Sequence, residues 1–178
     1  MSKYLFTSER LGFRDWLDKD FAPFAAMNQD KEVMKYFPKT LTESESAQTI
    51  ERFKKQFSRT AYTFFAVDLL DTEEFLGFIG LYDTTFESYF TPCVEIGWRL
   101  KKDSWNQGIA TEGALACLHY AKNETKLNEI FSFTSESNLP SQRVMQKIGM
   151  KHMGCFLHPK LPSGHALESH VLYKAVLE

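Results

Sequence analysis

The chain of 178 residues lacks the features that define several large protein classes. Its formal net charge is only -2, so it has no strong basic field of the kind that binds nucleic acid or an anionic membrane. No apolar stretch approaches the length of a membrane span, and charged residues occupy the N-terminal region where a signal peptide carries an apolar run. These absences predict a cytoplasmic protein with no nucleic-acid partner and no membrane partner.

Cysteine is scarce, with three residues at positions 93, 117 and 155. An odd count without paired spacing is neither a disulfide framework nor a zinc motif, and the five histidines are scattered. We therefore expect no metal. Cys117 and Cys155 are expected to be buried small hydrophobic residues rather than nucleophiles, because the sequence shows no cysteine–histidine pairing.

Two nucleotide-binding signatures are absent as well. The sequence contains no G-x-x-x-x-G-K-[ST] and no G-x-G-x-x-G pattern. Their absence argues against a P-loop phosphate site and against a dinucleotide-binding oxidoreductase.

The composition that remains is globular, with 43% hydrophobic and 25% charged residues. Its length suits one domain over residues 1–178. A short strand is expected within residues 10–16. A helix is expected over 18–30, capped by Asp18 or Asp20, and a second over 31–38, ended by Pro38. Thr42 and Glu45 form a capping-box pattern before a helix that reaches about residue 59.

The second part of the chain is rich in strands. Strands are predicted within 61–69, 75–83 and 93–100, and their short links favour an antiparallel meander. A helix follows from about 109 to 122, then a strand at 129–137, a helix at 139–149, and two closing strands within 151–159 and 165–177. The order predicts an α+β (mixed α/β) fold around one sheet.

The turn at residues 105–113, WNQGIATEG, links a predicted strand to a predicted helix. The first turn of a helix leaves backbone N–H groups unpaired, and the helix dipole adds positive charge there, so together they attract anions. Gly108 allows close approach to the backbone, Ala110 is small, and Thr111 adds a hydroxyl donor. The turn is therefore either a phosphate site or an ordinary connector.

A second cluster, NLPSQRVMQKIGM at residues 138–150, also lies between a strand and a helix. Together the two clusters resemble the GNAT superfamily of acyl-CoA-dependent N-acetyltransferases. The pyrophosphate loop of that family, [QR]-x-x-G-x-[GA], corresponds to residues 105–110, in which Gly108 and Ala110 match and Trp105 replaces the usual Gln or Arg. Tryptophan is common there in the branch of the ribosomal-protein N-terminal acetyltransferases RimJ and RimL.

The same branch has a pattern N-x-x-S-x-R-V-x-x-K-x-G-[FM] after the loop helix. Residues of this chain that match it are Asn138, Ser141, Arg143, Val144, Lys147, Gly149 and Met150. The N-terminal TSERLGFRDW and the strand VEIGW fit the branch too, so the resemblance covers essentially the whole chain.

The resemblance implies a GNAT fold, with a central twisted, mostly antiparallel sheet whose strands 4 and 5 splay apart, flanked by helices. Acetyl-CoA is expected in that gap, and its pantetheine arm is expected to pair with the backbone of Trp98, Arg99 and Leu100. Its pyrophosphate is expected on the amides of Asn106, Gln107, Gly108, Ile109, Ala110 and Thr111.

Glu95 is the candidate general base. Strand alternation places Cys93, Glu95, Gly97 and Arg99 on one face, and Gly97 leaves room for a substrate beside the carboxylate. The alternative is a solvated glutamate paired with Arg99. The oxyanion donor is expected to be the backbone N–H of Gly97 or Trp98.

Three residues of the second cluster have two interpretations each. Asn138 either binds the pantetheine arm or substrate, or caps the helix. Ser141 either protonates the leaving thiolate or bonds backbone in the first helical turn. Arg143 either pairs with a CoA phosphate or is a solvated charge. The aromatic residues that either line the acceptor pocket or pack in the core are Tyr36, Phe37, Tyr89 and Phe90.

The resemblance implies an enzyme that moves the acetyl group of acetyl-CoA directly to a primary amine. The acceptor is either the N-terminal α-amine of a ribosomal or other protein, or a small-molecule amine. A non-catalytic acyl-CoA-binding module is the alternative from another class, and either a monomer or a homodimer is expected.

Overall fold

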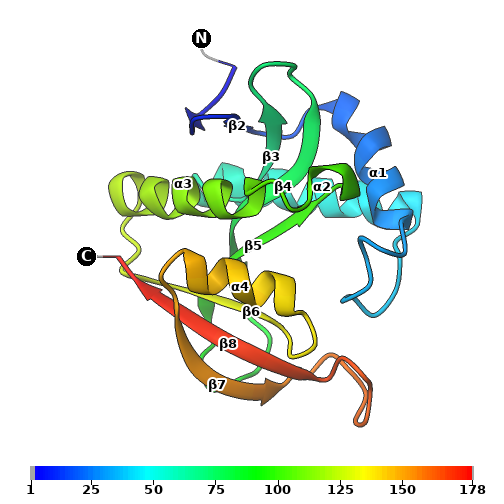
Figure 1. Ribbon diagram of the computed structural model, residues 1–178, viewed down its shortest axis with the longest axis vertical. Helices are drawn as coiled ribbons and strands as arrows, with labels where there is room; N and C mark the ends of the chain where they lie inside the picture. The colour runs from blue at the N-terminus through cyan, green and yellow to red at the C-terminus, as the bar shows by residue number, and fades with distance from the viewer. Residues whose placement is uncertain (1–2, 178) are drawn as a thin grey trace.

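One eight-stranded sheet runs through the computed structural model of the protein, which describes residues 3–177. Its strand order is β1-β2-β3-β4-β5-β6-β8-β7 (Figure 1), and every neighbouring pair is antiparallel except β5 and β6. The strands are β1 (Phe6–Thr7), β2 (Leu11–Arg14), β3 (Phe64–Leu69), β4 (Phe75–Thr84), β5 (Cys93–Leu100), β6 (Glu129–Ser135), β7 (Lys151–Leu157) and β8 (Ser169–Val176). The α+β class and the meander β3–β5 are therefore confirmed.

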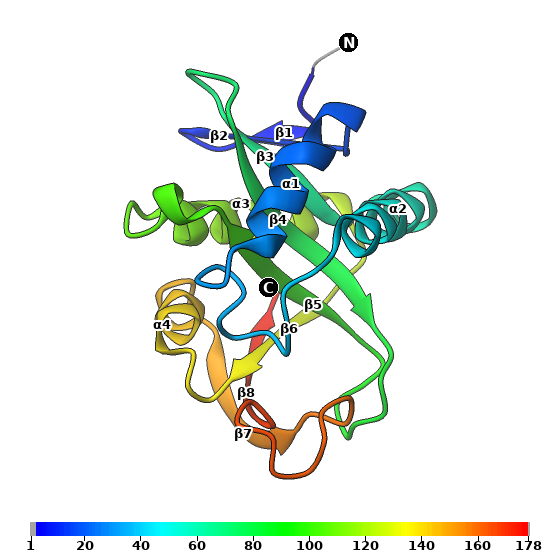
Figure 2. The same cartoon turned by 90° about the vertical axis from the view of Figure 1, so that its right-hand side faces the viewer.

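Helices lie on both faces of the sheet. They are α1 (Phe21–Gln29), α2 (Glu43–Thr60), α3 (Ile109–Glu124) and α4 (Leu139–Lys147). The helices α1 and α2 pack on one face through an aromatic core that includes Phe24, Phe53 and Phe78. On the other face, α3 packs on β4 so closely that a Cβ on Gly113 would lie 2.2 Å from Ile79 Cδ1. Figures 1 and 2 show α3 and the α1–α2 pair on opposite sides of the sheet.

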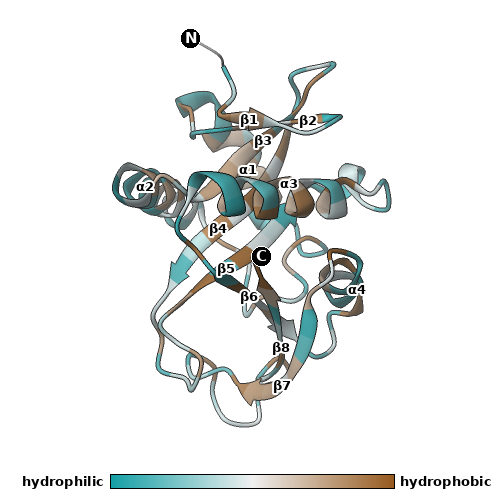
Figure 3. Ribbon diagram, turned by 90° about the vertical axis from the view of Figure 1, so that its left-hand side faces the viewer, coloured by the Kyte–Doolittle hydropathy of each residue, from teal (hydrophilic) through white to brown (hydrophobic). Residues whose placement is uncertain are grey.

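Hydropathy follows this layering. Apolar residues gather in the strands, whereas α2 is largely hydrophilic on its outer side (Figure 3). The buried positions of α2 recur at helical spacing, as Ser46, Thr49, Ile50, Phe53 and Gln56. None of the helices within residues 3–177 combines the length and the apolarity that crossing a membrane needs. The cytoplasmic location stays a prediction.

The sheet opens between β5 and β6. Strands β4 and β5 pair along their whole length, from Gly77↔Leu100 to Thr84↔Cys93, but β5 and β6 share only the register pair Glu95↔Phe131. Next to that pair, the Ser132 hydroxyl donates to the Ile96 carbonyl at 2.9 Å, where a backbone amide would otherwise pair. The splayed strands that the resemblance implied are confirmed. They are the predicted strands at 93–100 and 129–137, which are β5 and β6 in the numbering of the structure.

The start of α2 follows the capping-box prediction. Thr42 Oγ1 accepts from the Glu45 amide at 3.2 Å, and the Glu45 carboxylate accepts from the Thr42 amide at 2.8 Å. Two backbone donors of the first turn are thereby satisfied. The helix ends at Thr60, one residue beyond the predicted end.

The predicted cap of α1 is wrong. Asp20 does stand before the first residue of α1, but its carboxylate caps no first-turn amide of that helix. It accepts instead from Arg14 Nη1 and Nη2, at 2.6 and 2.9 Å, and from the Leu17 amide at 2.8 Å. A buried guanidinium is a stronger partner for a carboxylate than a helix amide, so the ion pair takes precedence.

The predicted helix over residues 31–38 is also wrong, because this segment forms turns. The Asp30 carboxylate accepts from the Glu32 amide at 2.8 Å, a local bond that competes with helix formation. One backbone bond of the segment, from Met34 to Asp30, spans four residues as in an α-helix, but those from Lys35 to Glu32 and from Phe37 to Met34 span only three. The segment therefore continues from the end of α1 as a series of turns.

Candidate active site

The candidate site is the opening of the sheet at the carboxyl ends of β5 and β6, which we call the crevice. These two strands are parallel and diverge beyond Glu95↔Phe131. The chain enters α3 after β5 and α4 after β6, so two helix N-termini follow the two diverging ends. In sheets with parallel strands, ligands bind in the crevice outside such carboxyl ends.

The loop before α3 presents free backbone donors. Asn106 and Gly108 have positive φ angles of 59° and 77°, and Gly108 is the N-cap residue. The first helical N–H bond is that of Glu112 to the Gly108 carbonyl, at 3.0 Å. Within residues 3–177, the preceding amides from 106 to 111 donate to no other group. This geometry suits a phosphate group.

Arg10 holds this loop and was missed by sequence reasoning. Its Nη1 donates to the Gln107 carbonyl at 3.0 Å, and its Nε donates to the Glu112 carboxylate at 2.7 Å. Glu112 also accepts from the Ser8 hydroxyl at 2.6 Å. A guanidinium therefore stands beside the amides of the loop. No local pattern could have linked residue 10 to a loop 97 positions away.

The edge of β5 that faces the crevice carries the Trp98 backbone. The Ile96 carbonyl points toward β6, because it accepts from Ser132. Backbone groups two residues apart in a strand point to the same side, so the N–H and C=O of Trp98 face the crevice. By the same alternation, the Arg99 backbone faces β4. The Leu100 carbonyl already accepts from Trp105 Nε1 at 2.9 Å.

The N-terminus of α4 is built by Asn138. Its Oδ1 accepts from the Ser141 amide at 3.3 Å, and its Nδ2 donates to Thr134 Oγ1 at 2.9 Å and to Ser141 Oγ at 3.1 Å. The structure therefore contains the helix cap that was one interpretation of Asn138. Because Ser141 Oγ accepts this bond, its own proton remains available to another acceptor. Arg143 is exposed on α4 and forms no ion pair with any residue from 3 to 177.

Glu95 lies on the face of β5 that α1 and α2 cover, opposite Tyr82 of β4. Burial raises its pKa from 4.5 to about 7, while a hydrogen bond with Thr84 and the charge of Lys160 act in the other direction. The carboxyl group is thus about half ionised near neutral pH, as a general base at that pH requires. The space beside Gly97 is partly filled, because a Cβ there would lie 3.1 Å from the Phe64 ring.

The burial of Glu95 predicts a pH-dependent effect on stability. Because its folded pKa, about 7, lies above the usual 4.5, stability falls as pH rises from about 4.5 to 7. Glu95→Gln carries no charge at any pH, so it should raise the free energy of unfolding by roughly 3 kcal/mol at pH 8 and by little at pH 4.5. Urea unfolding at both pH values measures this difference, with Glu87→Gln, at an exposed glutamate outside the helices and strands, as the control. An equal effect at both pH values would rule out this account.

The four aromatic residues predicted either to line an acceptor pocket or to pack in the core lie in different environments. Phe37 lies over the guanidinium of Arg99, with 4.1 Å from Cζ to the ring centroid, and Tyr36 lies near Lys35. Phe90 packs in an aromatic cluster with Phe131 and Phe156, so the core interpretation holds for it. Tyr89 is 71% exposed.

The cysteines show no sign of nucleophilic activation. Cys117 is fully buried, as predicted, but Cys155 is exposed, which contradicts the prediction. Cys155 lies on β7, the last strand of the sheet, where Phe156 on the opposite face takes the buried position. Burial and the charge of Glu95 raise the pKa of Cys93 to about 12, so its thiolate is scarce at neutral pH.

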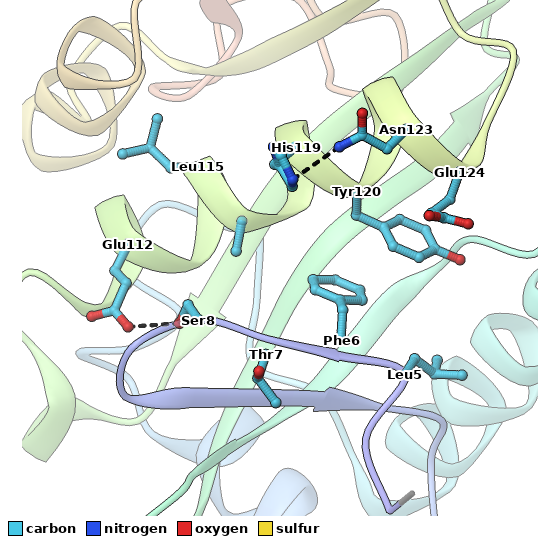
Figure 4. A pocket seen from close by; sticks show the side chains of 11 residues that line it. Leu5, Phe6, Thr7, Ser8, Glu112, Leu115, His119, Tyr120, Asn123 and Glu124 are labelled. Atoms are coloured by element: carbon cyan, nitrogen blue, oxygen red, sulfur yellow. Dashed lines mark hydrogen bonds between the residues drawn. The ribbon is translucent and has the colours of Figure 1, made fainter.

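Two further features lie outside this crevice. Among residues 3–177, no group of three or more His, Cys, Asp or Glu side chains could hold a metal ion. A groove of about 710 Å³ lies between β1 and α3 (Figure 4), where Phe6 and Tyr120 stack at 4.4 Å. None of the predicted site residues lines this groove.

Comparisons with known proteins agree with this fold. Residues 10–151 match the family model described as "Acetyltransferase (GNAT) domain", so the chain belongs to the GNAT acetyltransferase family. The uncharacterized N-acetyltransferase YnaD of Bacillus subtilis (strain 168) is 33% identical over 172 residues, which cover 97% of this chain and 96% of YnaD.

Solved structures of acetyltransferases share the fold. A GNAT-family acetyltransferase from Bacillus anthracis has a TM-score of 0.79 and 29% identity, with 96% of each chain covered. RimL, a ribosomal L7/L12 α-N-protein acetyltransferase solved in complex with coenzyme A, has a TM-score of 0.78 and 13% identity, with 97% of each chain covered. At that identity, the likeness to RimL concerns the fold alone.

Proposed function

We propose that this GNAT acetyltransferase moves the acetyl group of acetyl-CoA directly to a primary amine. The observation that carries the proposal is Glu95, a half-buried carboxylate with a raised pKa on the strand that borders the crevice. A binding protein gains nothing from such a group, because its ionisation in the folded state is costly. Glu95 therefore favours an enzyme over a non-catalytic acyl-CoA-binding module.

The residues present fit acetyl-CoA, which supplies an activated acetyl thioester when it is bound. The amides of Asn106, Gln107, Gly108, Ile109, Ala110 and Thr111 would hold the pyrophosphate. The Trp98 backbone would pair with the pantetheine arm, as an added strand pairs with an open sheet edge. Arg10 and Arg143 add positive charge, and Asn138 supports this site by capping α4.

The side chains around the crevice account for the proton transfers. An α-amine has a pKa near ~8 and a lysine near ~10.4, so the acceptor must lose a proton before its nitrogen attacks. Glu95 takes that proton, directly or through water. The Trp98 N–H would stabilise negative charge on the acetyl oxygen, whereas Gly97, the alternative donor, turns its N–H toward β4 as Arg99 does. As the C–N bond forms and the C–S bond breaks, Ser141 would give a proton to sulfur and regain one from solvent.

The acceptor we propose is an α-amine at a protein N-terminus or a small-molecule amine. An α-amine is partly neutral at cellular pH, so it suits a base whose pKa is about 7. The cysteines would take no covalent part, since burial raises the pKa of both Cys93 and Cys117, and Cys155 lies on the edge strand β7. Whether the enzyme is a monomer or a homodimer stays a prediction.

A thiol-release assay tests this function. Wild-type protein is incubated with acetyl-CoA and a panel of peptides and small amines, and mass spectrometry identifies the acetylated product. We expect release of one CoA thiol for each acetylated amine. If calorimetry shows that CoA binds but no amine is acetylated, the protein is an acyl-CoA-binding module.

A further inference from the structure

Arg14 is buried and Arg99 is half-buried, and the two guanidinium groups have different partners. Arg14 is 2% exposed, and two buried carboxylates pair with it, Asp20 and Asp68, each at 2.6 Å. Arg99 forms no ion pair with any residue from 3 to 177. Burial without a carboxylate lowers the pKa of Arg99 to about 10.

The surroundings of Arg99 compensate its charge only in part. Its Nη1 donates to Asn28 Oδ1 at 2.8 Å, and its Nε is buried without a hydrogen-bond partner in the described chain. The guanidinium carbon lies 4.1 and 5.3 Å from the ring centroids of Phe37 and Phe78. A neutral amide and two aromatic faces stabilise a cation less than a carboxylate does.

A half-buried cation in this state destabilises the folded protein, because its Nε has lost water without gaining a partner. An apolar side chain of similar size would pack against Phe37 and Phe78 without the desolvation cost or the unpaired Nε. The site therefore stabilises the fold poorly, and its charge is better explained by an anion that binds there. Arg14 shows how the same chain neutralises a buried guanidinium when its role is structural.

The position of Arg99 in the sheet indicates which bound molecule could carry the negatively charged group. Arg99 lies opposite Phe78, on the face of β5 that also carries Glu95, so both side chains lie on the side of α1. The α3 N-terminus, where the phosphates of acetyl-CoA are placed, belongs to the other face. Figure 2 shows α1 and the segment after it in front of β5, and Phe37 in that segment is 37% exposed.

The spacing sets the kind of molecule that can reach both groups. Glu95 and Arg99 are four residues apart on one strand, about 13 Å between Cα atoms. Both side chains can lean toward each other, and the guanidinium is the longer of the two. One molecule could therefore place an amine near Glu95 and an anion at Arg99, with a spacer between them.

Given the proposed function on which this rests, we propose that Arg99 binds a carboxylate of the acceptor, which is an amine that carries an acidic group a few bonds away. Such a carboxylate occurs in small amino carboxylic acids and in peptides with an acidic residue next to their N-terminus. A polyamine would instead bring a second cation toward the guanidinium, which repels it.

The experiment compares matched acceptors that differ only in this charge. γ-Aminobutyrate and 6-aminohexanoate are measured against their neutral amides, and N-terminal serine peptides with aspartate at the second position against the asparagine peptides. Spermidine is the acceptor that carries additional positive charge instead of a carboxylate. For wild type we expect kcat/KM to be about 10- to 100-fold higher for the carboxylate member of at least one pair.

Variants decide whether Arg99 causes this preference. In Arg99→Gln, the carboxylate-to-amide ratio should fall to about one, and Arg99→Lys should keep part of it. Affinity for CoA should not change in either. Arg52→Gln, on the exposed side of α2, is the charge control and should keep the wild-type ratio. A purely structural role would lower activity on every acceptor and leave the ratio unchanged, which would overturn the proposal.

A second measurement separates this inference from the proposed function. Calorimetry with CoA-loaded protein gives the affinity of the same amines without turnover. If no amine is acetylated but the carboxylates bind more tightly than the amides, and only with Arg99 present, the inference stands while the function fails. If amines are acetylated with no preference, or spermidine is the best acceptor, the inference fails while the function stands.

Discussion

Replacing Glu95 by Gln should lower kcat/KM for a confirmed acceptor by about 10²–10⁴-fold near pH 7. The substitution keeps the shape of the side chain and a partner for Thr84, but it removes the carboxylate that accepts the proton. Below pH 7 the wild type also loses activity, because Glu95 becomes protonated as pH falls through its pKa of about 7. Above the pKa of the amine, the acceptor needs no base. The ratio between the two enzymes should therefore peak between these two pKa values.

The measurement is a pH–rate profile of both proteins, with CoA affinity as the internal control. That affinity should barely change, because Glu95 faces α1 rather than the loop before α3. Two coinciding profiles would reduce Glu95 to a structural strand residue. A defect of the same size at every pH would mean that Glu95 positions the amine and does not take its proton.

Gly108→Glu should weaken CoA binding by at least about 100-fold. Gly108 has a φ of 77°, which other residues adopt with strain, and the new carboxylate would stand among the amides proposed to hold the pyrophosphate. Both steric overlap and charge oppose the phosphate. Isothermal calorimetry with CoA measures the loss.

Gly149→Glu is the matched control for this substitution. Gly149 also has a positive φ, 83°, and a Cβ there would meet no atom within 4 Å. It lies beyond the C-terminal end of α4, so it carries the same backbone strain and the same new charge away from the loop. Wild-type affinity in this control and in a folded Gly108→Glu protein would place the phosphate site elsewhere.

Local patterns predicted the parts of the fold that depend on neighbouring residues. The capping box of Thr42 and Glu45 is an interaction across three positions, and the structure contains it as predicted. The segment after α1 failed for an equally local reason. The Asp30 carboxylate binds a backbone amide, and hydrophobic periodicity does not report that competition.

In the candidate site, too, local features could be predicted from the sequence, whereas contacts between distant residues could not. The loop before α3 and the Asn138 cap could be predicted, since each is a short motif at a helix N-terminus. The contact of Arg10 with Gln107 and that of Arg99 with Asn28 join residues 97 and 71 positions apart. Strand alternation placed Glu95 on the correct face but could not show how strongly burial raises its pKa.

The single register pair between β5 and β6 makes the apex of a V, and Glu95 stands at that apex. When the arms of a V change their angle, a point moves in proportion to its distance from the apex. Adjustment of the crevice to a longer or shorter ligand would therefore displace the loop before α3 and the start of α4 most, and the carboxylate least. The fold thus allows ligands of different length at the open end, while it keeps the position of the Glu95 carboxylate fixed at the vertex.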